Sequence, residues 1–148
     1  MWLDDPKYIV PSFLVLWITV SLLISQISGW AELARYYRAA NPFQGQRWRF
    51  CSGRMRLTTR YNGCLTIGAD GYGLYLAVFF PFRLGHPDLF VPWQYVTVNH
   101  GKTLFWKWIE FRFQQAPHVW LRLYGTLADH IKTAAGSSWP TEGVISNN

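Results

Sequence analysis

The feature that most constrains this chain is a run of 24 positions without a charged residue, from Tyr8 to Ala31. At a rise of about 1.5 Å per residue, a helix of this length reaches roughly 36 Å, which is enough to cross a hydrocarbon core of about 30 Å. Pro11 falls in the first turn, where its missing N–H costs no hydrogen bond. Aromatic residues flank the run on both sides, as is typical of membrane–water interfaces. The sequence therefore predicts a single transmembrane helix over residues 8–30.

A cleaved signal peptide is the main alternative for this run. Such a peptide starts with basic residues and ends in small ones. Here the residues before the run include Asp4 and Asp5, and Trp30 follows the only small pair, Ser28-Gly29. Both features favour a retained anchor.

The distribution of basic residues predicts the orientation of that anchor. The chain carries 14 Lys and Arg against 8 Asp and Glu, and Lys7 is the only basic residue before the uncharged run. Seven arginines follow it between positions 35 and 60. The positive-inside rule then places the short N-terminus, residues 1–7, outside and the C-terminal bulk in the cytoplasm, at the inner (plasma) membrane.

Two regions are expected after the anchor. Residues 31–42 are rich in helix formers and end at Asn41-Pro42, which predicts a juxtamembrane helical linker. From residue 43 the pattern changes to alternating polar and apolar residues, which predicts antiparallel strands. We expect strands at 47–51 and 54–61 around a Ser52-Gly53 turn, with Tyr61 paired to Leu65. Further strands are expected at 65–69, 73–80, 89–93, 95–99, 104–113 and 118–124, followed by a helix at 126–135.

The fold class predicted for residues 43–136 is a small antiparallel barrel or sandwich closed by this C-terminal helix, with a disordered tail over 137–148. The segment Leu89-Phe90-Val91-Pro92-Trp93-Gln94-Tyr95-Val96, and the strand-then-helix ending over 119–135, resemble GRAM-type domains of the pleckstrin-homology superfold. The resemblance covers roughly residues 44–135. It implies a small bacterial membrane-anchored protein with a PH-like β domain.

The residues that could carry chemistry are sparse. The four histidines do not lie at metal-ligand spacing, and the few carboxylates form no evident acid–base pair. Cys51 and Cys64 could form a disulfide only if the domain lay outside the membrane. We therefore expect no enzyme, no metal, no cofactor and no nucleic-acid partner.

Arginines form the first candidate site. Alternation places the arginines of the first two strands on one outward face, close to the anionic inner leaflet. Each basic residue near such a surface contributes about 1 kcal/mol to membrane binding. The alternative is a solvated face that only obeys the positive-inside rule. The residues predicted to face lipid headgroups are Arg35, Arg38, Arg47, Arg49, Arg54, Arg56 and Arg60.

The second candidate site is the aromatic segment 104–113, which has large rings on both faces of a strand. These rings can be buried in the core of the domain or can contact a protein partner, and the sequence does not decide between the two. The residues predicted for partner contact are Phe105, Trp106 and Trp108.

Together these features predict a binding or scaffolding module at an anionic membrane surface, with an integral-membrane or membrane-bound protein as partner. The alternative is an accessory structural subunit of a larger membrane complex. Ser21, Ser25 and Ser28 recur on one side of the anchor helix and favour packing against other helices.

Overall fold

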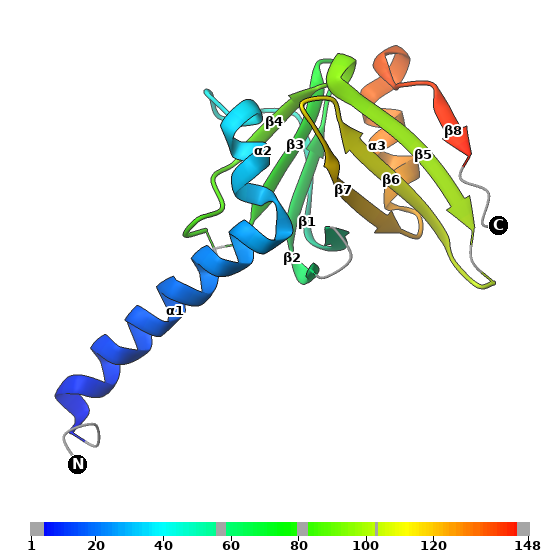
Figure 1. The fold of residues 1–148 in the computed structure, drawn as a ribbon. Coiled ribbons are helices and arrows are strands. Elements are labelled where there is room, and N and C mark those ends of the chain that lie inside the picture. The colour runs from blue at the N-terminus through cyan, green and yellow to red at the C-terminus, as the bar shows by residue number, and fades with distance from the viewer. Residues whose placement is uncertain (1–4, 56–58, 80–82, 103, 145–148) are drawn as a thin grey trace.

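The computed structural model describes residues 5–55, 59–79, 83–102 and 104–144. It consists of a long helix, α1 (Pro6–Ser28), and a mostly β domain that ends in a helix, as predicted (Figure 1). The domain contains α2 (Trp30–Tyr37), β1 (Gln46–Met55), β2 (Thr59–Ala69), β3 (Gly73–Val78), β4 (Leu89–Pro92), β5 (Val96–Lys102), β6 (Lys107–Phe113), β7 (Ala116–Tyr124), α3 (Leu127–Ala135) and β8 (Glu142–Val144). Short 3-10 turns occupy Trp93–Tyr95 and Gly136–Ser138.

The helix α1 projects from the domain (Figure 1). The Asp5 side chain caps its first turn by accepting a hydrogen bond from the Lys7 N–H, and Gly29 ends it in the left-handed region with φ 87°. Most of its apolar side chains are exposed. Within the described part of the chain, it is the one helix that is long and apolar enough to cross a membrane.

The helix α2 lies where the linker was expected but belongs to the domain. Gly29 turns the chain, and α2 then packs against β4 and β7 with Trp30, Leu33 and Tyr37 buried. These three residues are spaced i, i+3 and i+7, so they share one face of the helix. Residues 30–37 are therefore part of the core rather than a spacer that lies along the membrane.

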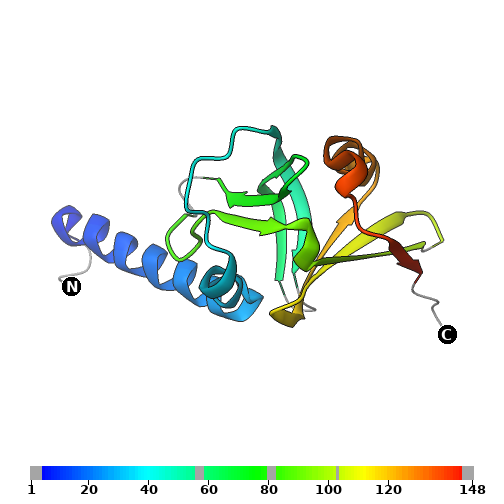
Figure 2. The same ribbon diagram turned by 90° about the horizontal axis from the view of Figure 1, so that it is seen from above.

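One eight-stranded sheet forms the domain, in the order β4-β3-β2-β1-β7-β6-β5-β8. All neighbouring strands are antiparallel except β5 and β8, which are parallel. Among the described residues, β1 and β7 share the pairs Arg54↔Arg122 and Met55↔Leu121, and the sheet bends sharply there (Figure 2). The expected barrel closure is not seen: β4 and β8 are the two edges, and no described residues pair them.

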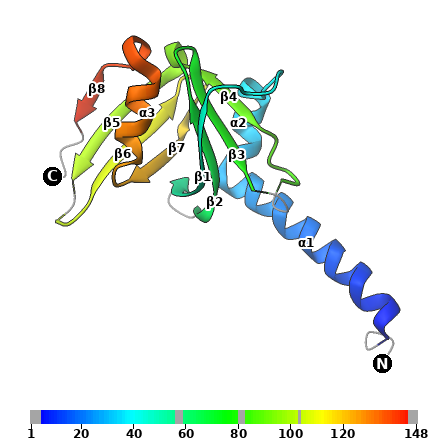
Figure 3. The same ribbon diagram turned by 180° about the vertical axis from the view of Figure 1, so that it is seen from behind.

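The core fills the concave side of this bent sheet. Apolar residues of both halves join one buried cluster, which the helices α2 and α3 complete. α3 lies against β2 and β7 and contributes Ile131 and Ala135 (Figure 3). The helices therefore cover apolar side chains that an open sheet would leave exposed.

The register of β1 and β2 differs from the expected one. Ser52-Gly53 lies inside β1 rather than at a turn, and Gly53, not Leu65, is opposite Tyr61. A Cβ on Gly53 would lie 2.9 Å from Leu123 Cδ2, so this glycine allows close packing instead of reversing the chain. Irregular pairing, with φ 56° at Phe50, then keeps Trp48 and Cys51 both against the core.

The expectation of disorder over 137–148 is wrong for its first part. The Trp139 side chain packs against the rings of Trp93 and Phe111, and its Nε1–H donates to Glu142 Oε1 at 2.8 Å. Lys132 Nζ lies 3.1 Å from the same oxygen. A single anchoring tryptophan orders this segment without any periodic pattern, and residues 145–148 lie outside the described range.

Candidate functional site

The end of α1 is packed directly against the β domain. Ser21, Ser25 and Ser28, the buried residues of α1, face β2 and the segment 83–88. At Gly85, with φ 77°, a Cβ would lie 3.0 Å from Leu22 Cδ2 and 3.3 Å from the Ser25 Cβ. Small residues on both sides thus let the segment approach the helix. The serine face expected to pack against other helices is occupied by the chain itself.

A buried polar cluster, here called the junction network, consists of Ser28, Tyr61 and His86. The Tyr61 hydroxyl lies 2.9 Å from Ser28 Oγ and 3.0 Å from His86 Nε2. His86 Nδ1 is 3.2 Å from the Leu84 carbonyl oxygen. Burial raises the pKa of Tyr61 to about 12, and the hydrogen bond with Ser28 only partly offsets this. The network therefore joins α1, β2 and the segment 83–88 through buried hydrogen bonds, and its tyrosine stays protonated.

The Trp30 ring adds a second connection at the same place. Its Nε1–H donates to the Pro87 carbonyl at 2.8 Å, and the ring is fully buried against those of Tyr61 and His86, with centroids 6.0 and 5.3 Å away. Trp30 is the first residue of α2 and follows the end of α1 by two positions. Its buried ring therefore fixes the end of α1 to the core of the β domain.

Beside the junction network lies an apolar cavity of about 400 Å³. Its walls come from α1, β2, the end of β3 and the histidine of the network. The lining residues are Ser21, Ile24, Ile27, Thr59, Arg60, Tyr61, Cys64, Val78 and His86. Arg60 is the one permanently charged residue among them.

The predicted arginine face is divided in the structure. Arg47, Arg49 and Arg54 all lie on β1, and Arg60 lies on β2 directly opposite Arg54. Arg47 and Arg54 are seven residues apart on the strand, which separates them by roughly 23 Å. They therefore do not form one compact patch.

The individual environments confirm this division. The Arg47 guanidinium lies over the rings of Phe43 and Tyr75 at 5.5 and 5.2 Å and donates to the Phe43 carbonyl. Arg35 is exposed on α2, and Arg38 is exposed at the C-terminal end of the same helix. Both arginines therefore lie on a helix that packs on the β domain, and neither belongs to α1. Arg56 lies outside the described residues. Only Arg60 lines the cavity beside α1.

The aromatic segment 104–113 is divided as well. Leu104, Phe105 and Trp106 are 84%, 80% and 64% exposed at the turn between β5 and β6. Trp108 is buried under the Arg122 guanidinium, which lies 4.0 Å from its ring centroid. Two of the three predicted contact residues are thus available to a partner, and Trp108 offers little surface.

A buried charge cluster that no sequence pattern indicated lies on the outer face of the sheet. Glu110 is fully buried, with Arg112 Nε 2.6 Å from Oε1 and Arg122 Nη2 2.8 Å from Oε2. Arg122 is opposite Glu110 in the β6–β7 register. A buried carboxylate held between two guanidiniums is a structural feature, since nothing leaves it a free oxygen for acid–base chemistry.

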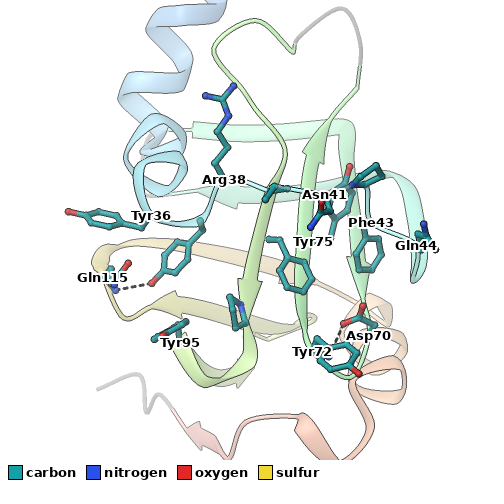
Figure 4. Close-up of a pocket in the computed structure, with 16 residues that line it drawn as sticks. Tyr36, Arg38, Asn41, Phe43, Gln44, Asp70, Tyr72, Tyr75, Tyr95 and Gln115 are labelled. Carbon is teal, nitrogen blue, oxygen red and sulfur yellow. Dashed lines mark hydrogen bonds between the residues drawn. The ribbon is translucent and has the colours of Figure 1, made fainter.

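A second missed feature is a tyrosine-lined cleft of about 710 Å³ between the end of α2 and the β3–β4 edge (Figure 4). The Tyr75 hydroxyl donates to Asp88 Oδ2 at 2.8 Å, and burial, with a smaller effect of this carboxylate, raises the pKa of Tyr75 to about 12. Asp70 Oδ1 accepts hydrogen bonds from the N–H groups of Tyr72 and Gly73. Its carboxylate thus holds a turn. Tyrosines that are distant in the sequence meet here, so no local pattern indicated the cleft.

Cys51 and Cys64 are free and half-buried, and burial raises the pKa of both thiols, which keeps them protonated. Over the described ranges, no group of three or more His, Cys, Asp or Glu could hold a metal ion. The sequence matches no protein-family model and no curated protein.

Proposed function

We propose that this chain is a single-pass membrane protein whose β domain is a binding or scaffolding module without catalytic activity, held at the cytoplasmic surface of the inner membrane. The length of α1 and the exposure of its apolar side chains support the anchor. The seven arginines that follow α1 support the cytoplasmic placement.

The observation that carries the proposal is the rigid junction between anchor and domain. A domain on a flexible linker could turn freely, and none of its surfaces would have a fixed direction relative to the bilayer. Here the junction network and Trp30 connect the end of α1 to β2, α2 and the segment 83–88. The domain is then held with defined surfaces towards the membrane and towards the cytoplasm, which suits a scaffold.

A pleckstrin-homology or GRAM-like relationship remains part of this proposal. Seven strands followed by the C-terminal helix α3 support it. The open sheet and the added parallel strand β8 depart from that pattern.

The exposed β5–β6 turn is the surface we assign to a protein partner. Leu104, Phe105 and Trp106 form an apolar tip between Lys102 and Lys107. An accessory structural subunit is the second candidate, and the same tip favours it, because a permanent complex would cover these side chains.

Photo-crosslinking of the full-length protein in its native membrane tests the proposal. A photoreactive residue at Phe105 is expected to give a discrete adduct with another membrane-associated protein, whereas one at Thr97, exposed on β5, is expected to give none. A membrane-bound chain that forms no adduct from position 105 would contradict the binding role. A fixed-stoichiometry complex in mild detergent would favour the accessory subunit.

A further inference from the structure

The cavity between α1 and β2 has the composition of a lipid site. Ile24, Ile27 and Val78 give it apolar walls, and Arg60 lies at its β2 side. Its volume of about 400 Å³ falls within the range of roughly 300–1,000 Å³ that is usual for small-molecule pockets. It is thus large enough for part of a lipid.

The position of the cavity along α1 determines its depth in the membrane. The lining begins at Ser21, seven residues before the last residue of α1, or about 10 Å along the helix. If α1 crosses the bilayer, as the proposed function requires, the cavity lies in the leaflet next to the domain. Water does not fill an apolar groove at that depth, so a hydrocarbon chain is the natural occupant.

The charge beside the cavity indicates the headgroup. Arg60 is exposed, and among the residues that the structure describes no Asp or Glu contacts it. Arg54 lies directly opposite on β1, which adds a second positive charge at this end of the strand pair. A guanidinium binds phosphate oxygens through paired N–H donors.

The floor of the cavity is polar but already satisfied. The Tyr61 hydroxyl is bonded to Ser28 and His86, so these groups do not need a ligand to complete their hydrogen bonds. Recognition of a headgroup therefore falls to Arg60, and the walls recognise the chain.

We propose that this cavity binds one anionic phospholipid, with an acyl chain between α1 and β2 and the phosphate on Arg60. The inference rests on the proposed membrane anchor and adds a specific site to it. A bound lipid would fill the gap between helix and domain, so that lipid composition affects how firmly the two are held together.

Native mass spectrometry of the full-length protein, released from nanodiscs with equal amounts of phosphatidylglycerol and phosphatidylcholine, tests this site. The wild type is expected to retain one phosphatidylglycerol in preference to phosphatidylcholine. Arg60→Gln should reduce that preference about tenfold or more, because a charged hydrogen bond is lost. Lys102→Gln, at an exposed basic residue on β5 outside the cavity and outside the predicted arginine face, should leave it unchanged.

A second pair of variants tests the apolar part. Ile24→Trp, which fills the cavity, should abolish retention of either lipid, whereas Leu23→Trp, at the same depth but outside the lining, should not. Equal retention of both lipids by the wild type, or equal behaviour of the Arg60 and Lys102 variants, would overturn the lipid site while leaving the anchor intact. Recovery of the wild type in the aqueous fraction would instead overturn the proposed function.

Discussion

The hydroxyl of Tyr61 on β2 lies 2.9 Å from Oγ of Ser28, the last residue of α1. Tyr61 is 33 residues further along the chain, so this bond connects the helix to the middle of the sheet domain. This hydrogen bond is buried. It holds the end of α1 against the domain, although most of the apolar surface of α1 is exposed.

Removing this hydroxyl is expected to weaken the junction. Tyr61→Phe leaves Ser28 Oγ and His86 Nε2 buried without their common partner, which should lower the free energy of unfolding by about 1–3 kcal/mol. Urea titration of the detergent-solubilised protein measures the change. Tyr72→Phe is the matched control, because Tyr72 is 82% exposed, and an equal loss in both variants would contradict a structural role for the network.

The helix α2 is expected to be essential for folding of the domain. Trp30→Ala removes a fully buried ring and should cost about 3–5 kcal/mol, whereas Tyr36→Ala, half exposed on the same helix, should cost much less. For the same reason a fragment of residues 41–148 is expected to lack the cooperative unfolding transition that we expect of the full chain, with circular dichroism as the measurement. A stable 41–148 fragment would show that α2 is a linker after all.

The buried Glu110 should be the most sensitive charge in the domain. Glu110→Gln leaves the partly exposed Arg112 and Arg122 beside a neutral amide, and the loss of these charge-assisted hydrogen bonds should cost about 1.5–3 kcal/mol. Glu142→Gln, at a partly exposed carboxylate, should cost about 1 kcal/mol or less. The two unfolding free energies, measured side by side, check this order, and the reverse order would contradict it.

Two buried tyrosines should make the protein sensitive to alkali. The pKa values of Tyr61 and Tyr75 are raised to about 12, whereas an unfolded tyrosine titrates near 10. Because the unfolded chain loses its protons first, the stability that these neutral groups provide is complete below about pH 10 and is lost as the pH rises towards 12.

Tyr61 should then contribute about 3 kcal/mol to the decrease in unfolding free energy across that interval, and Tyr75, whose hydrogen bond with Asp88 is only partly buried, should contribute less. Tyr75→Phe should reduce the decrease, and its size relative to the wild type is obtained from urea titrations at several pH values. An identical pH dependence in the variant would show that Tyr75 titrates normally.

Local patterns in the sequence were sufficient for the elements but not for their pairing. The uncharged run from Tyr8 to Ala31 and the alternating segments after it predicted the helix and most strands, because both signals depend on neighbouring residues. The contact between β1 and β7 brings Arg54 next to Arg122, which are distant in the sequence. The open and bent form of the sheet depends on that pairing, and so the sequence predicted only that the domain is a barrel or a sandwich.

Glycine was the most misleading residue. Ser52-Gly53 is a common turn pair, yet Gly53 is buried where Leu65, Leu121 and Leu123 leave no room for a side chain. The two requirements, a turn and a close approach, select the same amino acid.

The candidate site was predicted only in part. Arg60 was expected to face lipid, and its position beside α1 fits that hypothesis. The cavity itself needs Ser21, Tyr61 and His86 to meet, and no spacing in the sequence indicates a contact between segments so far apart.

The central claim is that α1 crosses the bilayer with the segment 83–88 packed beside it, and the depth of Leu84 tests this most directly. Leu84 is 48% exposed next to Gly85, which packs on Leu22. A fluorophore at Leu84→Cys, in full-length protein with Cys51 and Cys64 replaced by Ser and reconstituted into liposomes, reports that depth. The account predicts quenching by brominated lipids and protection from aqueous iodide, and ready quenching by iodide with no effect of brominated lipids would contradict it.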